Sequence, residues 1–346
     1  MKKIGNQSYI LSKPVNILST ASIVGPKEKE GPLNSYFDKC LDDEFWGENS
    51  WEKAESKMIK EATNMAISKS DLASSQIDFC IAGDLLNQCI SSTFGMRDSN
   101  IPFFGIFGAC STFGEALTLG SMLIDGDFAS NVAAAVSSHF CSAEKQFRFP
   151  LELGNQRAPS SQWTVTGSGC AILSKDGTGP YITALTPGKI VDMGIKDANN
   201  MGAAMAGAAQ DTLLAHFKDT GRKPNYYDAI FTGDLGHIGK DILIDLMSSK
   251  GYNIKSNYND CGVLIFDKEK QDTHSGGSGC GCSASVFCGF ISKMFETKKY
   301  KRILLMPTGA LTNATTTQQG ESIPGIAHAV AIEAAFPDDL KLKGEL

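Results

Sequence analysis

The sequence predicts an α/β fold that is built from two duplicated halves, and three observations predict it. A helical pattern followed by a short apolar strand occurs in each half of the chain, further segments match between the halves, and these matches keep one order. At 346 residues and 42% hydrophobic content, the chain is long enough for two domain-sized units, or for one large domain with a duplicated core.

The helix and strand patterns come first along the chain. Apolar side chains recur on one helical stripe between residues 51 and 68, and "IDFCIAGD" at 77–84 has the length of a short buried strand. The same order returns in the second half. The segment "MGAAMAGAAQDTLLAHF" at 201–217 predicts a helix, and "YDAIFTGD" at 227–234 predicts the strand that follows it. A helix followed by a parallel strand is the repeating unit of an α/β sheet.

The two halves also align segment by segment. "DFCIAGD" at 78–84 matches "DAIFTGD" at 228–234. Three further matches follow in the same order: the helix from Cys110 with the helix from Cys282, the strand from Asn131 with the strand from Ile303, and the closing strand 169–174 with 327–332. We therefore predict a duplication with halves at residues 1–178 and 179–346.

Charge and composition exclude several classes of protein. The net charge is −6, and the sequence contains no long basic block. Nucleic-acid binding requires a cationic surface, so we expect no nucleic-acid partner. We expect neither a signal peptide nor a transmembrane segment, because no apolar run approaches the roughly 20 residues of a spanning helix. The ten cysteines are irregularly spaced in apolar segments, which indicates reduced, buried thiols rather than a disulfide framework.

One cysteine stands in a position suited to chemistry. "FFGIFGACSTFGEAL", residues 103–117, places Cys110 between a glycine-rich turn and the first turn of a predicted helix. Unpaired N–H groups and the helix dipole at such a position lower the pKa of a thiol, which acyl-transfer enzymes exploit for nucleophilic catalysis.

These features together resemble the thiolase superfamily. In that fold, two similar halves pack into a five-layer αβαβα sandwich, and "GACS" is similar to the nucleophile turn of the type III ketoacyl synthases within it. More narrowly, "GDLGHIGKDI", "HSGGSGCGCSASVF" and "QQGESIPGIAHAVAIE" resemble the stage V sporulation protein AD (SpoVAD) family of spore-forming bacteria. The resemblance covers nearly the whole chain.

The catalytic partners of the nucleophile are where the chain departs from the synthase pattern. Where the synthases have "PHQAN", this chain has "TGDLG", with Gly233 at the histidine position, and where they have "GNTSAAS" it has "GCGCSAS", with Cys280 at the asparagine position. A cysteine does not supply the hydrogen bonds of an amide. His237, just beyond the first loop, remains open as a shifted replacement, but we predict a protein that is not an enzyme.

A pocket without catalysis can still bind a ligand. His328 is the internal counterpart of Cys170, near where the halves meet, and Arg148 belongs to a basic loop that also holds Lys145 and Arg157. Aromatic walls and polar groups on neighbouring loops complete the predicted site. The candidate ligand-binding residues are Cys110, His328, Phe107, Phe231, Thr166, Ser168, Thr308, Asn313 and Arg148.

We expect no metal and no cofactor. "CGC" at 280–282, with Cys288 and His274 nearby, holds enough soft ligands for zinc, but the spacing matches no paired C-x-x-C arrangement. Small residues that let a helix approach closely explain the segment as well.

The SpoVAD resemblance implies a ligand and a location. The ligand is dipicolinic acid, free or as its calcium chelate, moved into the forming spore and out at germination together with integral membrane proteins. The protein would lie peripherally at the forespore or spore inner membrane, and the fold family implies a homodimer. Two alternatives stay open. One is an acyl transferase or condensing enzyme that uses Cys110, and the other is a purely structural scaffold whose pocket no longer has a function.

Overall fold

One large mixed β-sheet runs through the computed structural model, which describes residues 1–147 and 157–337. Its strand order is β11-β10-β13-β16-β9-β2-β8-β6-β4-β5, with β1 and β3 also paired to β2, and two short pairs, β12 with β7 and β14 with β15, lie outside it. The strands are β1 (Lys2–Ile4), β2 (Ser8–Val24), β3 (Lys39–Cys40), β4 (Phe79–Gly83), β5 (Phe103–Gly105), β6 (Asn131–Ser138), β7 (Trp163–Thr164), β8 (Gly167–Ser174), β9 (Tyr181–Thr186), β10 (Ala229–Thr232), β11 (Tyr258–Asp260), β12 (Gly277–Ser278), β13 (Arg302–Met306), β14 (Thr308–Ala310), β15 (Gly325–Ala327) and β16 (Ala329–Glu333).

The strand order is symmetric about the central antiparallel pair of β2 and β9. Outward from that pair, β8, β6, β4 and β5 on one side correspond to β16, β13, β10 and β11 on the other. The directions correspond too, because β8 and β16 are antiparallel to their neighbours while the outer strands of each side are parallel. The predicted α/β fold of two similar halves is thus confirmed, while a division at residue 178, between β8 and β9, stays a prediction.

Strand register follows the internal alignment that the sequence predicted. Ala133 of β6 pairs with Ile172 of β8, and their aligned counterparts, Leu305 of β13 and Val330 of β16, also pair. One difference concerns the aligned segments themselves. The strand expected from Ile303 is divided into β13 and β14, and the closing strand is divided into β15 and β16 at His328.

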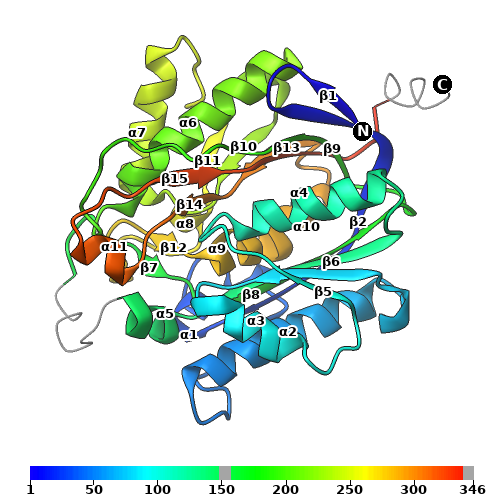
Figure 1. The fold of residues 1–346 in the computed structure, drawn as a ribbon, viewed down its shortest axis with the longest axis horizontal. Coiled ribbons are helices and arrows are strands. Elements are labelled where there is room, and N and C mark those ends of the chain that lie inside the picture. Colours follow the sequence, from blue (N-terminus) through cyan, green and yellow to red (C-terminus); the bar gives the residue numbers. More distant parts are fainter. Residues whose placement is uncertain (148–156, 338–346) are drawn as a thin grey trace.

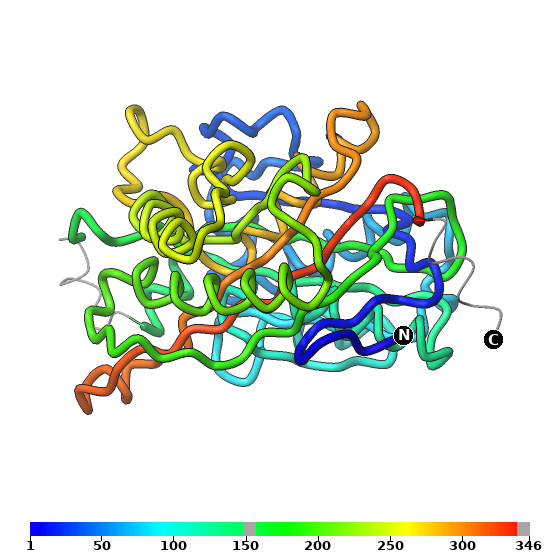
Figure 2. The backbone as a smooth tube through the Cα atoms, turned by 90° about the horizontal axis from the view of Figure 1, so that it is seen from above, coloured from blue at the N-terminus to red at the C-terminus, as the bar shows by residue number. Residues whose placement is uncertain are grey.

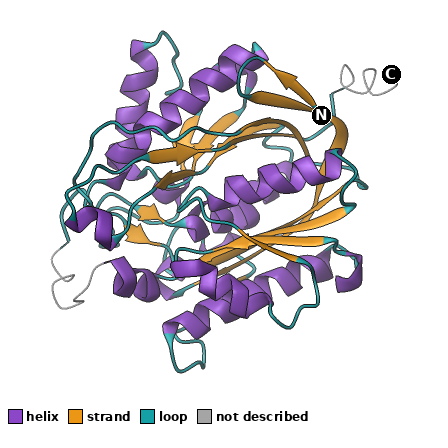
Figure 3. Ribbon diagram, viewed as in Figure 1, coloured by secondary structure: helices purple, strands orange, loops and turns teal. Residues whose placement is uncertain are grey.

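Helices form three layers around and between the two parts of the sheet (Figure 1). Helices α4 and α9 contact each other between the sheet halves, α2 and α3 cover the outer face of the first half, and α6 and α7 pack together over the second (Figures 1 and 2). The α-helices are α1 (Pro26–Lys29), α2 (Trp51–Lys69), α3 (Ile90–Met96), α4 (Thr112–Asp125), α5 (Phe140–Phe147), α6 (Met201–Thr220), α7 (Gly236–Ser249), α8 (Cys261–Leu264), α9 (Cys280–Val286), α10 (Ser292–Glu296) and α11 (Ala314–Gln318). Further short helical segments are η1 (Asn34–Tyr36), η2 (Ser74–Gln76), η3 (Asn87–Cys89), η5 (Pro224–Tyr226) and η6 (Phe287–Ile291). The layers alternate as α, β, α, β, α (Figure 3).

The central layer is tightly packed against the sheet and within itself. The rings of Phe113 on α4 and Phe287 after α9 lie 5.7 Å apart, and both side chains are fully buried. A Cβ atom at Gly169 of β8 would lie 2.6 Å from the backbone of Ala284, so only glycine lets α9 approach the sheet this closely. This packing holds the beginnings of α4 and α9 at the boundary between the halves.

Local sequence explains the elements that the helical pattern predicted. Helix α2 begins at Trp51 because the Ser50 side chain caps it by accepting a hydrogen bond from the Lys53 N–H. Its buried residues include Ala54, Met58 and Ala62, the stripe that predicted it. All ten cysteines are free thiols, and eight of them are buried as expected, whereas Cys40 and Cys141 are partly exposed.

Candidate functional site

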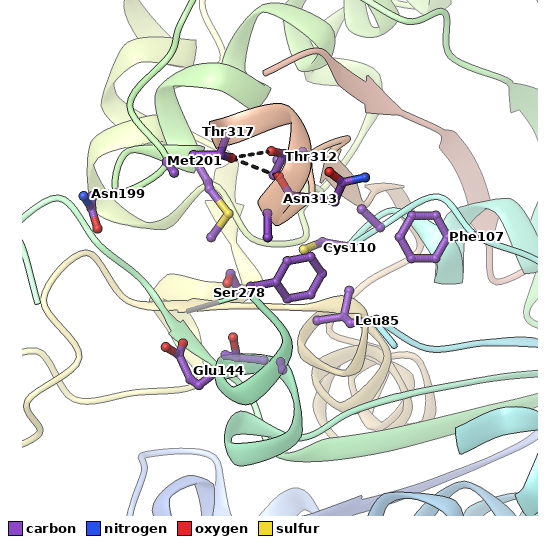
Figure 4. Close-up of a pocket in the computed structure, with 17 residues that line it drawn as sticks. Leu85, Phe107, Cys110, Glu144, Asn199, Met201, Ser278, Thr312, Asn313 and Thr317 are labelled. Atoms are coloured by element: carbon purple, nitrogen blue, oxygen red, sulfur yellow. Dashed lines mark hydrogen bonds between the residues drawn. The ribbon is translucent and has the colours of Figure 1, made fainter. Parts of the chain in front are cut away.

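A cavity of about 160 Å³ lies where loops from both halves meet at the beginning of α4 (Figure 4). Its walls are mainly apolar and aromatic, with a few amide, hydroxyl and carboxyl groups. The described residues that line it are Leu85, Phe107, Ala109, Cys110, Ala143, Glu144, Phe147, Thr164, Ala198, Asn199, Met201, Ser278, Ala310, Thr312, Asn313, Ala314 and Thr317.

Cys110 reaches this cavity from the turn that precedes α4. The turn is sharp, since Ala109 adopts a left-handed backbone conformation with φ of 49°. It is also tightly covered, because a Cβ at Gly309 would lie 2.3 Å from the carbonyl oxygen of Gly108. The sulfur of Cys110 is therefore held at a fixed point, with only 6% of the residue exposed.

The electrostatic surroundings keep the Cys110 thiol protonated. Burial raises the pKa of Cys110 well above its ordinary value, and the negative charge of the Asp234 carboxyl and a hydrogen-bonding interaction with it raise that pKa further. The backbone N–H of Gly279 acts in the opposite direction but is a smaller influence. The pKa of Cys110 is therefore raised, whereas its position before α4 alone suggests a lowered one.

Asp234 follows β10, in the segment "TGDLG" that the sequence comparison set against the "PHQAN" motif of the synthases. Its Oδ1 accepts hydrogen bonds from the Thr308 hydroxyl (2.6 Å) and the Thr308 N–H (3.3 Å), whereas Oδ2 is buried and has no N–H or O–H donor among the described residues. Burial, above all other causes, raises the pKa of Asp234 to about 7. The preceding residue, Gly233, is so closely packed that a Cβ there would lie 3.0 Å from the Cα of Pro307.

Cys280 is the second thiol close to Cys110. It begins α9, is fully buried, and its Sγ donates to the carbonyl oxygen of Ser137 at 3.0 Å. Burial raises its pKa well above the ordinary value, and the charges of Asp84 and Glu55 raise it further. Cys280 also contributes to the raised pKa of Cys110. Asp234, Cys280 and Cys110 are thus neighbouring acids and thiols whose pKa values are all raised by burial.

Three of the residues predicted from the sequence line the cavity: Cys110, Phe107 and Asn313. Phe107 is 49% exposed and stands at the cavity wall. Asn313 also caps α11, because its side-chain oxygen accepts a hydrogen bond from the Thr316 N–H at 2.9 Å. This hydrogen bond orients the side-chain amide of Asn313, and Asn313 also contributes to the cavity wall.

Four other predicted residues lie outside the cavity lining. Phe231 is 2% exposed and packs in the core against Tyr300. The Ser168 hydroxyl donates to the Val136 carbonyl inside the sheet, and Thr166 lies beside Glu28 and Glu44. Thr308 donates two hydrogen bonds to Asp234, and neither residue belongs to the described lining.

His328 lies between β15 and β16 behind α4, where its carbonyl oxygen would lie 3.0 Å from a Cβ at Gly114. Its Nδ1 accepts a hydrogen bond from the Gly188 N–H at 3.1 Å. Burial lowers the pKa of His328 to about 4, so the imidazole is neutral. His328 and His237 are both absent from the described cavity lining, and Arg148 lies outside the described residues.

Sequence reasoning missed the wall that α5 forms. Ala143 and Glu144 are adjacent on this short helix, Phe147 follows one turn later, and all three line the cavity. A signal was present, because α5 directly follows β6, one of the strands matched between the halves. Glu144 is the one charged side chain in the described part of the lining.

The symmetric five-layer fold, with a cysteine at the start of a central helix, defines a thiolase-fold protein. Solved structures show the same fold: 3-oxoacyl-[acyl-carrier-protein] synthase III of Aquifex aeolicus (13% identity, TM-score 0.56, 92% of this chain and 99% of that one), a variant of OleA of Xanthomonas campestris (12%, 0.61, 96% and 100%) and human mitochondrial 3-ketoacyl-CoA thiolase in complex with CoA (10%, 0.56, 94% and 99%). At these identities the likeness concerns the fold alone.

The particular family is shown by sequence. The model of the stage V sporulation protein AD (SpoVAD) family matches residues 5–333. Stage V sporulation protein AD of Bacillus subtilis (strain 168) is 44% identical over 335 residues, which cover 97% of this chain and 99% of that protein. The chain belongs to the SpoVAD family, as its motifs predicted, and this membership supports a role in sporulation.

The helices that the structure describes include none that is both long enough and apolar enough to span a membrane.

Proposed function

We propose that the protein is a non-catalytic component of the spore transport assembly that binds dipicolinic acid, free or as its calcium chelate, in the Cys110 cavity. The family supports the setting, since its members are named for a stage of sporulation. The ligand and the transport role are what the family resemblance implies, and the cavity is compatible with them.

The observation that carries the proposal is the pairing of Cys110 with Asp234. A nucleophilic thiolate needs a base or a positive charge beside it, whereas the carboxyl of Asp234 raises the pKa of this thiol. The described lining of the cavity contains no histidine that could exchange protons with a thioester substrate. Both observations favour binding without turnover.

Cavity size and walls suit a small aromatic ring. Its volume, about 160 Å³, lies below the roughly 300–1,000 Å³ of sites for drug-sized ligands. Phe107 and Phe147 offer flat apolar faces, and Asn313, Thr312 and Ser278 offer hydrogen-bonding groups.

Oxygen atoms in the cavity wall suit the calcium chelate. Free dipicolinate carries two negative charges, whereas a one-to-one chelate with Ca²⁺ is neutral. In the chelate, the cation can also face an oxygen ligand of the protein, and Thr312, Asn313 and Ser278 bring side-chain oxygen atoms to the lining.

Calorimetry with purified protein tests the proposal. We expect binding heat with equimolar calcium dipicolinate, and weaker binding of dipicolinate with a chelator present to remove Ca²⁺. Benzene-1,3-dicarboxylate is the matched control, because it has the same carboxylate spacing but lacks the ring nitrogen. Absence of heat with both forms, while circular dichroism shows an intact fold, would rule the proposal out.

An acyl transferase that uses Cys110 is the second candidate, favoured by the position of the thiol before α4. Incubation with short-chain acyl-CoA and intact-mass measurement separates the two. An acyl adduct that disappears in Cys110→Ala would support the enzyme, whereas an unmodified mass with several donors would support binding alone.

The location and partners are proposals of the same kind. We infer a peripheral position at the forespore or spore inner membrane, where integral membrane proteins of the same assembly supply the path across the bilayer. Co-purification of these proteins with the tagged chain from sporulating-cell membranes tests the association. Recovery of the chain only in the fraction free of membranes would contradict it.

A further inference from the structure

We propose that Glu44, His139 and Cys141 form a binding site for a divalent transition metal of the zinc type. One ligand atom from each of these residues lies within 4.8 Å of the other two. Glu44 belongs to the loop between β3 and α2, His139 directly follows β6, and Cys141 lies in the first turn of α5. The site therefore joins segments nearly 100 residues apart in the sequence.

The donor set suits zinc. A thiolate, an imidazole and a carboxylate are the ligands that Zn²⁺ uses in proteins, whereas Ca²⁺ and Mg²⁺ take oxygen ligands. With three protein ligands, a tetrahedral ion keeps one position for water or another group. Binding replaces the proton of the Cys141 thiol, which is released to solvent as the sulfur–metal bond forms.

The His139 ring is buried and fixed between two backbone groups. Its Nε2 lies 2.8 Å from the carbonyl oxygen of Glu44, to which it donates, and Nδ1 accepts from the Cys141 N–H at 3.2 Å. The carboxylate oxygen Oε2 of Glu44 lies 3.6 Å from Nε2. A metal ion would replace one of the two backbone contacts, and the other would keep the ring in its orientation.

A second carboxyl group, that of Glu28, contacts the same threonine as Glu44. Glu28 is fully buried, and its Oε2 has no hydrogen-bond partner among the described residues. Its Oε1 accepts a hydrogen bond from the Thr166 N–H at 3.0 Å, while the Thr166 hydroxyl lies 3.5 Å from Oε2 of Glu44. Two carboxyl groups thus flank one threonine, and a divalent cation would offset their mutual repulsion.

Bound metal would fix the start of α5. The next turns of this helix carry Ala143, Glu144 and Phe147, which form one wall of the Cys110 cavity. A metal at the beginning of the helix would hold that wall in place without touching a ligand inside the cavity. The inference does not depend on which ligand the cavity takes.

Titration of the full chain with Zn²⁺ alone, after treatment with a chelator, tests the site. We expect stoichiometric binding, a rise in melting temperature, and, with Co²⁺ as substitute, the absorption band of a sulfur–cobalt bond. Cys141→Ser should weaken binding by roughly tenfold or more and abolish that band. Glu44→Gln, at a partly exposed position, should weaken binding while leaving the fold unchanged.

Cys40→Ser is the matched control, because Cys40 is the other partly exposed cysteine and should bind metal as the unaltered protein does. Equal Zn²⁺ affinity in Cys141→Ser and Cys40→Ser would overturn the site, as would absence of binding by the unaltered protein. Tighter binding of Ca²⁺ than of Zn²⁺ would equally overturn the assignment of a zinc-type metal.

Discussion

The thiol of Cys110 and the carboxyl of Asp234 interact across the boundary between the two halves of the molecule. Cys110 comes from the turn before α4 in the first half, and Asp234 follows β10 in the second. The two effects are opposite in sign, because the carboxylate disfavours a thiolate and raises the pKa of Cys110, whereas the hydrogen bond of the thiol lowers the pKa of Asp234. The relationship reverses the logic of a cysteine enzyme, in which the partner of the thiol withdraws its proton.

Replacement of Asp234 should make Cys110 more reactive. Asp234→Asn removes the negative charge and keeps the shape that accepts the Thr308 hydrogen bonds, so the pKa of Cys110 falls. Each unit of that fall raises the thiolate fraction, and with it the alkylation rate, by about tenfold when the pH lies below the pKa. Iodoacetamide labelling at fixed pH, followed by peptide mass measurement, gives the rate at Cys110 alone. Equal labelling rates in the variant and the unaltered protein would show that Asp234 does not control the thiol.

Asp234 should also leave a signature in the pH dependence of stability. Its pKa rises from 3.8 to about 7 on folding, mainly through burial, so the folded state holds this proton over a range in which the unfolded state has lost it. The stabilisation is therefore present below about pH 4 and disappears as the pH rises through about 7, at up to roughly 1.4 kcal/mol per pH unit. Asp234→Asn should flatten the fall in unfolding free energy over that range, measured by urea unfolding. Parallel curves for both proteins would contradict the assignment.

Sequence reasoning reached the fold because its signals are local and repeated. The stripe at 51–68 became α2, and the aligned strand pairs share one register, since period and order are set by the chain itself. The depth of a strand residue is set instead by what covers the sheet. Both faces of β8 are covered by helices, so Ser168 is buried within the sheet rather than at a wall.

The cavity residues also divide into those that local sequence signals predict and those whose position depends on tertiary contacts. Cys110 was found because a helix start after a glycine-rich turn is visible in the sequence, and Asn313 because it was placed on a loop where the two halves were expected to meet. Glu144 and Phe147 were not found, because the direction of α5 depends on contacts between distant segments. One of these is the bond from the His139 imidazole to the Glu44 carbonyl, and no periodicity in the chain reports it.

A homodimer should depend on the edge strand β5. This strand ends the sheet on the first-half side and exposes half of the Phe104 side chain, so its free backbone groups and apolar surface suit pairing with a second copy. Phe104→Glu places like charges opposite each other across such a pair and should yield a monomer by light scattering after gel filtration. Phe128→Glu is the matched control, since Phe128 is also exposed but lies outside the edge strand. A monomeric unaltered protein would disprove the dimer.

The cavity itself can be narrowed from its rim to locate ligand binding. Ala314 lines the cavity at the first residue of α11 and is exposed, so Ala314→Phe can occupy the opening without overpacking the core. If calcium dipicolinate binds there, its affinity should fall by about tenfold or more, the equivalent of at least 1.4 kcal/mol, while the melting temperature stays within a few degrees. Thr315→Phe adds the same ring one residue further along α11, at an exposed position that does not line the cavity. The Thr315→Phe variant should therefore bind calcium dipicolinate with the same affinity as the unaltered protein.

The comparison of these two variants separates the site from the surface around it. Equal losses would mean that a ring anywhere on α11 disturbs binding through the helix, and unchanged affinity in both would move the ligand out of the cavity. A loss confined to Ala314→Phe requires the ligand to enter the space bounded by Cys110, because the two substitutions add the same group to the same helix and differ only in which side of it they cover.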